Sequence, residues 1–481
     1  MAVSLYWHDY ETWGEKPTQD KPSQFAGVRT NEALEIIGEP LSIYCQPPSD
    51  SLPKPIACMI TGITPQHAME HGFSDHEFIA KIHRELSRPG TCGVGYNSIR
   101  FDDEVTRNGL FRNFYDPYER EWRNGNSRWD IIDMVRLTYA LRPEGIEWPR
   151  NEDGSPSFRL ELLSAANGLI HEAAHDALSD VYATIAMAKL IKEKQPNLYD
   201  YAFRMRNKKE VGNLIDLQTK KPLLHISSKY PATQACSALV IPLAMHPTNK
   251  NGVIVYDLSA DPSMLIDLTA DEIHERLFVR QEDLPEDVSR VPLKVVHLNK
   301  SPILVTPKLV DGDAEKRMLL DKAKCDEHWK VLRDAALDVS LVEKLHHVFE
   351  KSNFEQSSDP EQSLYNGFLN DGDKSTSSEV RKSSAEELKN STFSFYDQRL
   401  SELLFRYRAR NFPESLSDEE KAEWEEFRKQ KFTDPKLGYT ISEFKNDIGG
   451  LLNNSETTEK QKNILNDLLA YEQALTKDMN L

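Results

Sequence analysis

The stretch Val3–Gly14, VSLYWHDYETWG, opens on apolar residues and ends with two carboxylates. The apolar and β-branched content of Val3–His8 predicts a strand, and Asp9 and Glu11 lie at its end. Side chains two positions apart on a strand share one face, roughly 6–7 Å apart along the backbone, so both carboxylates can converge on bound cations. A D-x-E pair alone is weak evidence in a chain with 77 acidic residues, because a solvated strand end explains it equally well.

Strand-like and helix-like segments alternate over residues 1–201, which is typical of an α/β domain. Further strands are predicted at Phe25–Arg29, Glu35–Cys45 and Thr91–Tyr96. Helices are predicted at Phe73–Leu86, Asp130–Leu141 and Asp176–Lys194. We therefore expect one domain over residues 1–201.

The rest of the chain changes character twice. Residues 202–351 hold short strand-like runs between turn-rich pieces, which predicts a small β-rich domain; the runs are Pro222–Ile226, Leu239–Leu243, Val253–Leu258 and Leu293–His297. Residues 352–394 are rich in Ser, Glu, Asp, Asn and Lys, so we expect a linker and an exposed stretch there. Helical periodicity then returns, and residues 352–481 are expected to form a helical domain behind this Ser-rich linker; the periodic segments are Leu400–Tyr407, Asp418–Lys431 and Glu459–Leu475.

Composition narrows the class of protein. A chain of 481 residues is long enough for about three domains, and its net charge of −18 opposes indiscriminate attraction to nucleic acid. The five cysteines are widely spaced and form no CxxC, so we expect neither a disulfide framework nor a zinc site. No apolar run approaches the ~20 residues of a membrane-spanning helix, and no secretory signal is evident. A reducing cytoplasm is the compartment that we expect.

Two more acids and a histidine occur at places where a site can form. Asp102 follows the strand-like run TCGVGYN at a strand-to-helix junction, where Asp103 could equally cap the helix. Asp180 lies at the edge of the apolar stripe of a predicted helix, where a carboxylate needs a partner. His175 precedes that helix and could reach a bound water, although a lone histidine there is more often a surface or capping residue.

The motifs become specific when they are taken together. D-x-E, N-x-x-x-F-D and H-x-x-x-x-D occur in this order within 180 residues, and this arrangement resembles the DEDD-type exonucleases of the ribonuclease H-like fold. Four carboxylates and a histidine suit phosphodiester hydrolysis with two divalent ions and a general base. The predicted catalytic residues are Asp9, Glu11, Asp102, Asp180 and His175, and the predicted metal ligands are the four carboxylates.

Stretches unrelated to metal binding narrow the resemblance to the bacterial exonuclease I family. They are HDYETWG, ITGITPQ, YNSIRFDDEVTRN, NSRWDIIDM, YALRPEGIEWP, PSFRLE, HDALSDVYATIAMAKL, LYNGF and LLFRYRARNFPESL, and they extend from residue 8 to about 416. The resemblance implies an α/β ribonuclease H-like exonuclease domain, an SH3-like β-rich domain and an α-helical C-terminal domain. It also implies processive Mg²⁺-dependent hydrolysis of single-stranded DNA from the 3′ end, which releases 5′-mononucleotides and serves DNA repair and recombination. Two Mg²⁺ ions are expected, with Mn²⁺ as a substitute.

Aromatic and basic residues surround the acidic motifs and suit a channel for a strand end, since single strands are held by cations and stacking faces. The predicted substrate contacts are Tyr10, Trp13, Arg100, Arg107 and Arg128, with Phe101, Arg112 and Trp129 nearby in sequence. The resemblance further implies docking of the acidic C-terminal tail of single-stranded-DNA-binding protein (SSB). The matching positions are Arg142, Tyr201, Lys221 and Arg333. Arg333 is assigned to the terminal carboxylate, because a guanidinium can hold it with two hydrogen bonds.

Other readings stay open at this stage. The same fold could degrade short RNA from the 3′ end, although no obvious RNA-binding module is present. An inactive adaptor for SSB would need a missing metal ligand, and all four carboxylates and His175 are present. A glycosidase uses two carboxylates and does not need five groups in this order. A monomer is the expected state.

Overall fold

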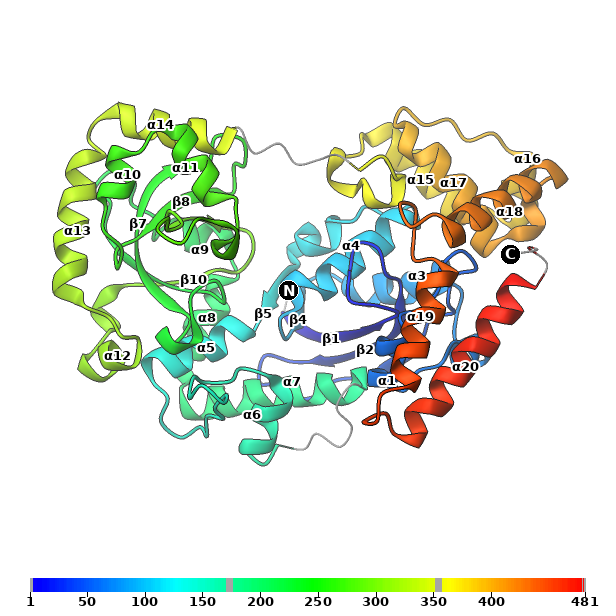
Figure 1. Ribbon diagram of the computed structural model, residues 1–481, viewed down its shortest axis with the longest axis horizontal. Helices are drawn as coiled ribbons and strands as arrows, with labels where there is room; N and C mark the ends of the chain where they lie inside the picture. The colour runs from blue at the N-terminus through cyan, green and yellow to red at the C-terminus, as the bar shows by residue number, and fades with distance from the viewer. Residues whose placement is uncertain (1–2, 170–175, 351–356, 478, 480–481) are drawn as a thin grey trace. The chain divides into compact units, whose positions relative to one another are not determined.

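The computed structural model of the chain describes residues 3–169, 176–350, 357–477 and 479 (Figure 1). The chain divides into two compact units. The first unit comprises Met1–Ser127, Glu172–Tyr182 and Gln356–Leu481, and the second comprises Arg128–His171 and Ala183–Glu355. The N-terminal strands and the C-terminal helices therefore belong to one unit, although hundreds of residues separate them in sequence.

A five-stranded mixed sheet organises the N-terminal part, with the strand order β3-β2-β1-β4-β5. Its strands are β1 (Ser4–Thr12), β2 (Pro22–Thr30), β3 (Leu41–Tyr44), β4 (Thr91–Gly95) and β5 (Ser127–Asp130). The central strand β1 is antiparallel to β2 and parallel to β4. Parallel pairing puts the carboxyl ends of β1 and β4 at the same edge of the sheet, which brings the segments after these strands together.

Helices α3 (Asp75–Leu86) and α4 (Asp102–Arg112) cover one face of this sheet. Phe78 and Ile82 of α3 and Val105 of α4 are buried against Tyr6 and Phe25 of the sheet. Burial of side chains of this size stabilises the fold by about 1.5–3 kcal/mol each. Helix α4 thereby starts at a fixed place beside the end of β1.

The C-terminal helices pack on this core through two apolar clusters, and Figure 1 shows α19 (Ile441–Leu452) and α20 (Glu459–Thr476) side by side. Phe444 and Leu465 meet Trp13 of the N-terminal segment. Three helices before them make the second cluster around Phe111 and Phe114; they are α15 (Asp371–Lys382), α16 (Ala385–Asn390) and α17 (Gln398–Asn411). Helix α18 (Asp418–Thr433) instead contributes Phe432 to the first cluster.

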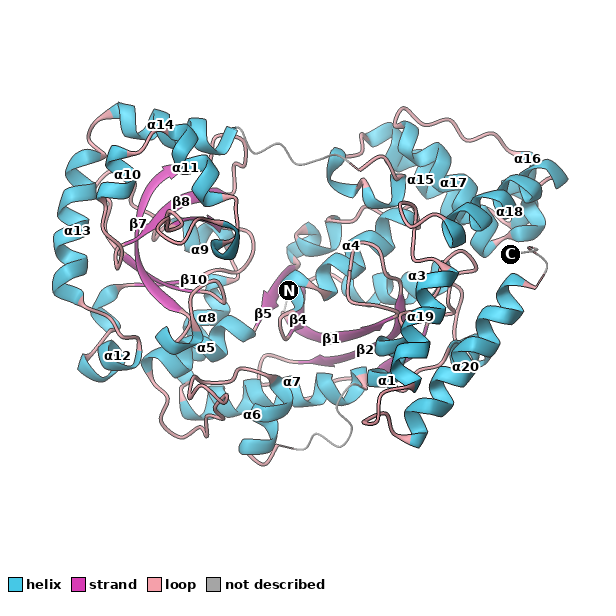
Figure 2. Ribbon diagram, viewed as in Figure 1, coloured by secondary structure: helices cyan, strands magenta, loops and turns pink. Residues whose placement is uncertain are grey.

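The second unit holds an antiparallel sheet with strand order β10-β6-β7-β8-β9 (Figure 2). Its strands are β6 (Leu223–Ile226), β7 (Ser237–Met245), β8 (Gly252–Asp257), β9 (Leu293–His297) and β10 (Ile303–Val305). Helices α13 (Lys322–Ala335) and α14 (Val339–Glu350) pack against β7. The unit also contains α5 (Ile132–Leu141), α6 (Leu160–Ala166), α8 (Pro196–Met205), α9 (Lys208–Gly212), α10 (Ser263–Asp267), α11 (Ala270–Leu277) and α12 (Gly312–Arg317).

The structure differs from the sequence prediction in two places. The strand predicted for Glu35–Cys45 is limited to Leu41–Tyr44, because Gly38 adopts a left-handed φ of 81° and Pro40 has no backbone donor. Within the stretch expected to be exposed, α15 and α16 form and bury Val380 and Leu388. Within the described ranges, no helix is both long and apolar enough to cross a membrane.

Candidate metal centre

Strand β1 presents two carboxylates on one face near its end. Asp9 and Glu11 are half-buried, whereas Tyr10 between them points to the opposite face and is buried in the apolar core. The pairing of β1 with β2 shifts register between Glu11 and Thr12. Such bulges are common beside active sites, where they re-aim side chains. The predicted common face of Asp9 and Glu11 is confirmed.

Helix α7 (Ala177–Lys194) brings a third carboxylate to this strand end. Ala177 and Val181 are buried, and the half-buried Asp180 lies beside them, as the apolar stripe predicted. One oxygen each from Asp9, Glu11 and Asp180 lies within 4.8 Å of the others. These three carboxylates form the candidate metal centre.

The electrostatics of this centre favour a cation. Burial raises the pKa of Asp9 well above its ordinary value, and repulsion from Asp102 and Glu11 adds to the effect. Burial, with repulsion from Asp180 and then Asp102, raises the pKa of Glu11 to about 8. Without a counter-ion, it is therefore unfavourable for all of the clustered carboxylates to be ionised at once. An all-oxygen donor set of this kind fits a hard divalent ion such as Mg²⁺.

Asp102 is the fourth predicted carboxylate and lies at the first position of α4, the strand-to-helix junction that the sequence predicted. Its Oδ1 accepts a hydrogen bond from the backbone N–H of Tyr10 at 3.0 Å. Asp102 is buried, and its charge contributes to the raised pKa values of Asp9 and Glu11. The neighbouring Asp103 instead pairs with Arg120, with 2.6 Å between Oδ1 and Nη2. Asp102, not Asp103, therefore belongs to the acidic cluster.

The structure adds a fifth carboxylate that the sequence reasoning did not single out. Asp176 repels Asp9 and Glu11, and its Oδ2 accepts a hydrogen bond from the Ser179 N–H at 3.2 Å at the start of α7. Gln24 of β2 pairs with Glu11 in register and donates its side-chain amide to Asp176 Oδ1 at 2.9 Å. The signal in the sequence was the Asp immediately before a helix, where a capping residue is common.

His175, the predicted general base, lies outside the described residues. Among the predicted substrate contacts, Arg100 is exposed on the short 3₁₀ turn Ser98–Arg100 just before Asp102. Arg128 is buried in the second unit, where its Nη2 donates to the Asn299 carbonyl at 3.1 Å. Arg100 is thus the predicted cation with the most open side chain.

The other predicted substrate contacts have internal partners. The Tyr10 ring is buried against Phe25, and Trp13 is buried in the cluster with the C-terminal helices, so neither ring offers a free stacking face. Arg107 is buried and binds Glu121 through Nε at 2.7 Å, besides Glu104. These three residues therefore shape the surroundings of the acidic cluster from within the core.

The four predicted SSB contacts all belong to the second unit. Arg142 Nη1 lies 3.0 Å from Oδ2 of Asp311, the residue just before α12, and the Tyr201 hydroxyl donates to the Leu304 carbonyl of β10. Arg333 lies over the Trp329 ring at 5.0 Å.

Trp329, which lies under Arg333, also contacts the chain next to Lys221, the fourth predicted SSB contact. The Trp329 indole N–H donates to the Lys220 carbonyl at 2.8 Å, and Lys221 follows in sequence with an exposed side chain. Trp329 therefore contacts Arg333 through its ring and the residue before Lys221 through its indole N–H.

Comparisons with known proteins agree with this architecture. A family described as Exonuclease matches residues 6–188, the Exonuclease I SH3-like domain matches residues 206–351, and the Exonuclease I C-terminal domain matches residues 358–475. Exodeoxyribonuclease I of Escherichia coli (strain K12) is 46% identical over 431 residues, which cover 89% of this chain and 90% of the relative.

Two solved structures are similar over nearly the whole chain. E. coli exonuclease I in complex with a dA16 oligonucleotide has a TM-score of 0.94 at 42% identity and covers 98% of this chain and 100% of that chain. A structure of SSB/exonuclease I in complex with the inhibitor CFAM has a TM-score of 0.91 at 41% identity and covers 99% of this chain and 100% of that chain.

The fold and the carboxylate cluster define a nuclease of the exonuclease class with a ribonuclease H-like catalytic domain. The SH3-like and helical C-terminal domains follow it along the chain, so the predicted fold class is confirmed. The chain belongs to the exonuclease I family.

Proposed function

We propose that this protein hydrolyses single-stranded DNA processively from the 3′ end, with Mg²⁺, and releases 5′-mononucleotides. The observation that carries the proposal is the set of three carboxylate oxygens within 4.8 Å of one another at the end of β1. The raised pKa values of Asp9 and Glu11 support a site built to receive divalent cations. Similarity to an exonuclease I that binds a dA16 oligonucleotide supports single-stranded DNA as substrate.

The residues of the metal centre have two different proposed roles, metal binding and proton removal. Asp9, Glu11, Asp102 and Asp180 would hold two Mg²⁺ ions. When bound, the ions supply charge for the phosphoryl oxygens and lower the pKa of the attacking water. We assign the general-base role to His175, because an imidazole that titrates near neutral pH suits proton removal from that water.

The scaffold keeps the carboxylates in place before any ion binds. The Tyr10 amide holds Asp102 beside β1, and Gln24 holds the start of α7 through Asp176. Such preorganisation favours catalysis, because little rearrangement is then needed when substrate charge develops. Arg100, exposed two residues before Asp102, is our candidate for a phosphate contact.

We also propose that the second unit binds the acidic C-terminal tail of SSB through Arg142, Tyr201, Lys221 and Arg333. The relative solved as SSB/exonuclease I supports this partner. The terminal carboxylate would lie on Arg333, whose side chain is 40% exposed. We place the protein in the cytoplasm as a monomer that acts in DNA repair and recombination.

The experiment offers the purified protein single-stranded DNA, duplex DNA and single-stranded RNA of one sequence, each with Mg²⁺, with Mn²⁺ or with EDTA. Rapid loss of single-stranded DNA with either ion, and none with EDTA, is expected. Degradation of RNA at the same rate would support the alternative exoribonuclease, and activity in EDTA would overturn the metal-dependent proposal.

A further inference from the structure

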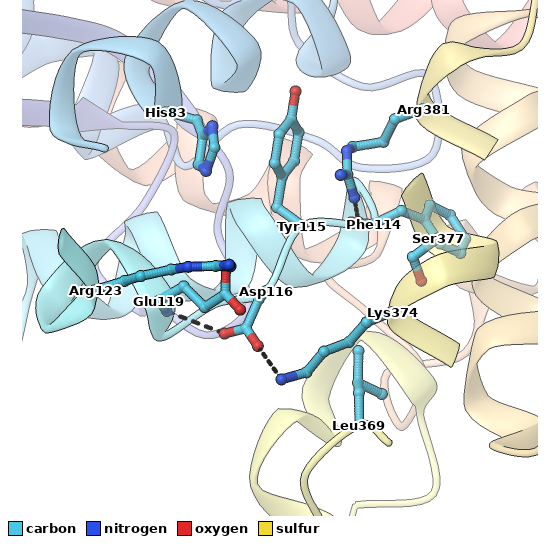
Figure 3. Close-up of a pocket in the computed structure, with 10 residues that line it drawn as sticks. All are labelled: His83, Phe114, Tyr115, Asp116, Glu119, Arg123, Leu369, Lys374, Ser377 and Arg381. Atoms are coloured by element: carbon cyan, nitrogen blue, oxygen red, sulfur yellow. Dashed lines mark hydrogen bonds and ion pairs between the residues drawn. The ribbon is translucent and has the colours of Figure 1, made fainter. Parts of the chain in front are cut away.

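A cavity of about 220 Å³ lies beyond the C-terminal end of α4 and is walled on one side by α15 (Figure 3). Helix α4 starts with Asp102 and is 11 residues long, so the cavity and the carboxylate cluster lie at opposite ends of this helix. At 1.5 Å rise per residue the helix separates them by roughly 15 Å. The cavity is therefore a separate feature from the candidate metal centre.

The charges around the cavity leave one cation without an acid. Lys374 pairs with Asp116 at 2.8 Å, and Arg123 pairs with Glu119 at 2.6 Å. Arg381 donates to the Phe114 carbonyl and lies 4.3 Å from the Tyr115 ring centroid. Within the described part of the chain, it has no carboxylate within 4 Å.

His83 also lines the cavity, but it does not change the net charge of the lining. Burial lowers the pKa of His83 to about 4, and the positive charge of Arg381 adds to this effect. The ring is therefore uncharged near pH 7, and the lining carries about one net positive charge.

The lining of this cavity also includes a buried hydroxyl group. Ser377 of α15 lines it, is only 2% exposed, and its Oγ has no hydrogen-bond partner among the described residues. An unsatisfied buried hydroxyl costs about 1–3 kcal/mol, so such groups are rare unless a ligand or water meets them. Figure 3 shows Ser377 and Arg381 on the same helical wall.

Aromatic side chains form part of the lining. His83 and Tyr115 lie against each other with ring centroids 4.4 Å apart, and Phe114 lies next to them in the lining. A dry cavity of about 150 Å³ can hold benzene. A cavity of about 220 Å³ has room for one such ring with a small polar substituent.

We propose that this cavity binds a small aromatic monocarboxylate about the size of benzoate, with its carboxylate on Arg381 and Ser377 and its ring against Tyr115 and His83. One negative charge matches the guanidinium of Arg381, which has no carboxylate partner among the described residues, and a planar carboxylate matches its fork of donors. The Ser377 hydroxyl gains an acceptor that none of the described residues provides. The ligand would join the loop after α4 to α15 and so stabilise the first unit by mass action.

The test is calorimetric titration of the full-length protein with benzoate, phenol and acetate, together with thermal unfolding. Benzoate should bind and raise the midpoint, while phenol and acetate should bind at least about tenfold more weakly, because each lacks one of the two recognised groups. Absence of benzoate binding at millimolar concentration would overturn the proposal. Equal affinity for acetate or phenol would also overturn it.

Ser377→Ala separates binding from folding. Because Ser377 Oγ has no hydrogen-bond partner in the part of the chain that the structure describes, its loss should leave the ligand-free unfolding midpoint unchanged or raise it, yet weaken benzoate binding about tenfold. Ser378→Ala, one position further along α15 and outside the lining, is the matched control and should bind like wild type. Arg381→Met should lose benzoate binding. Wild-type affinity in Ser377→Ala or Arg381→Met would contradict the assignment.

Discussion

The backbone N–H of Tyr10 donates to Asp102 Oδ1 at 3.0 Å, which fastens the start of α4 to the strand that carries Asp9 and Glu11. Thr106, one turn into α4, adds a second link, because its Oγ1 and the Tyr10 hydroxyl lie 3.0 Å apart. Tyr10 thus supports the metal centre through its backbone N–H and through its buried ring. The ring offers no face to substrate.

Asp102 can be tested for charge separately from structure. In Asp102→Asn the acceptor for the Tyr10 amide remains, so the unfolding midpoint should stay near wild type. Asp102→Ala leaves that amide unsatisfied and should cost about 1–3 kcal/mol. Both variants should lose nearly all hydrolysis, because the negative charge toward the cations is gone. A fully active Asp102→Asn would show that only the hydrogen bond matters.

The three clustered carboxylates should oppose stability while they enable activity. Asp9→Asn, Glu11→Gln and Asp180→Asn each remove a repelling group, so unfolding in EDTA should occur at the wild-type temperature or above it. Hydrolysis should fall by roughly 10²–10³-fold or more, since electrostatic stabilisation of the transition state is lost. Glu15→Gln, an exposed acid in the same segment, is the control and should change neither quantity. Wild-type turnover in any of the three at saturating Mg²⁺ is the result that the assignment forbids.

Gln24 is expected to act as a positioning residue through Asp176. Gln24→Ala removes the 2.9 Å amide contact that holds the start of α7, so Asp180 loses part of its support. Loss of such support around metal ligands typically lowers metal affinity or activity 10–100-fold. The Mg²⁺ concentration for half-maximal activity should rise, and excess Mg²⁺ should restore part of the rate. Gln19→Ala, at an exposed position, should match wild type, and an unchanged Mg²⁺ requirement in Gln24→Ala would refute the role.

Sequence reasoning found the parts of the site that depend on local pattern. The D-x-E pair lies on a strand end, Asp102 begins a helix, and Asp180 borders a buried stripe, because pleat and helical periodicity are properties of neighbouring residues. Gln24 was not found, because its partner Asp176 lies 152 positions away. Arg107 was expected at substrate, but its pairing with Glu121 depends on how the chain folds after α4.

The same limit applies to the C-terminal helices. Their periodicity was readable, but their packing against the N-terminal core depends on contacts between distant residues. Asp50 is the clearest case: Arg410 donates to its two oxygens at 2.8 Å each, and Lys431 Nζ lies 2.7 Å from Oδ2. No local pattern around Asp50 predicts either partner.

This buried acid predicts an acid-side loss of stability. Burial would raise the pKa of Asp50, but Arg410 and Lys431 outweigh it and hold the pKa well below its usual value. An acid with a lower pKa in the folded than in the unfolded state stabilises the fold above the unfolded value of about 3.9, and this contribution is lost as pH falls. Stability should therefore decline as pH falls below about 4.

Asp50→Asn should remove this contribution. At neutral pH it leaves Lys431 without this acid and Arg410 with Glu361 as its remaining acid partner among the described residues, and it should cost about 3–5 kcal/mol. Its stability should also fall less steeply than that of wild type below about pH 4. Chemical denaturation at several pH values measures both effects. Asp418→Asn, in an exposed pair with Lys421, should cost less than about 1 kcal/mol, and an equally small cost for Asp50→Asn would contradict the account.

Arg333 is the sharpest test of the proposed SSB site. Arg333→Ala should weaken binding of an SSB tail peptide roughly 10- to 150-fold, because a charge-assisted and bidentate contact is lost. Hydrolysis of bare DNA should stay unchanged, and digestion of SSB-coated DNA should slow. Lys324→Ala, nine positions earlier on α13 and so on the opposite helical face, is the control. Equal peptide affinity of Arg333→Ala and wild type would remove Arg333 from the site, and no binding by wild type would remove the site.

The most direct test of the central claim follows a single-stranded DNA labelled at its 5′ end through time with wild type and Asp180→Asn, in Mg²⁺ and in EDTA. The account predicts that wild type in Mg²⁺ shortens the strand from the unlabelled 3′ end, so that the label stays on ever shorter DNA until the last nucleotides. Neither Asp180→Asn nor wild type in EDTA should shorten it. Immediate release of the label as a mononucleotide, or shortening by Asp180→Asn at the wild-type rate, would contradict the claim.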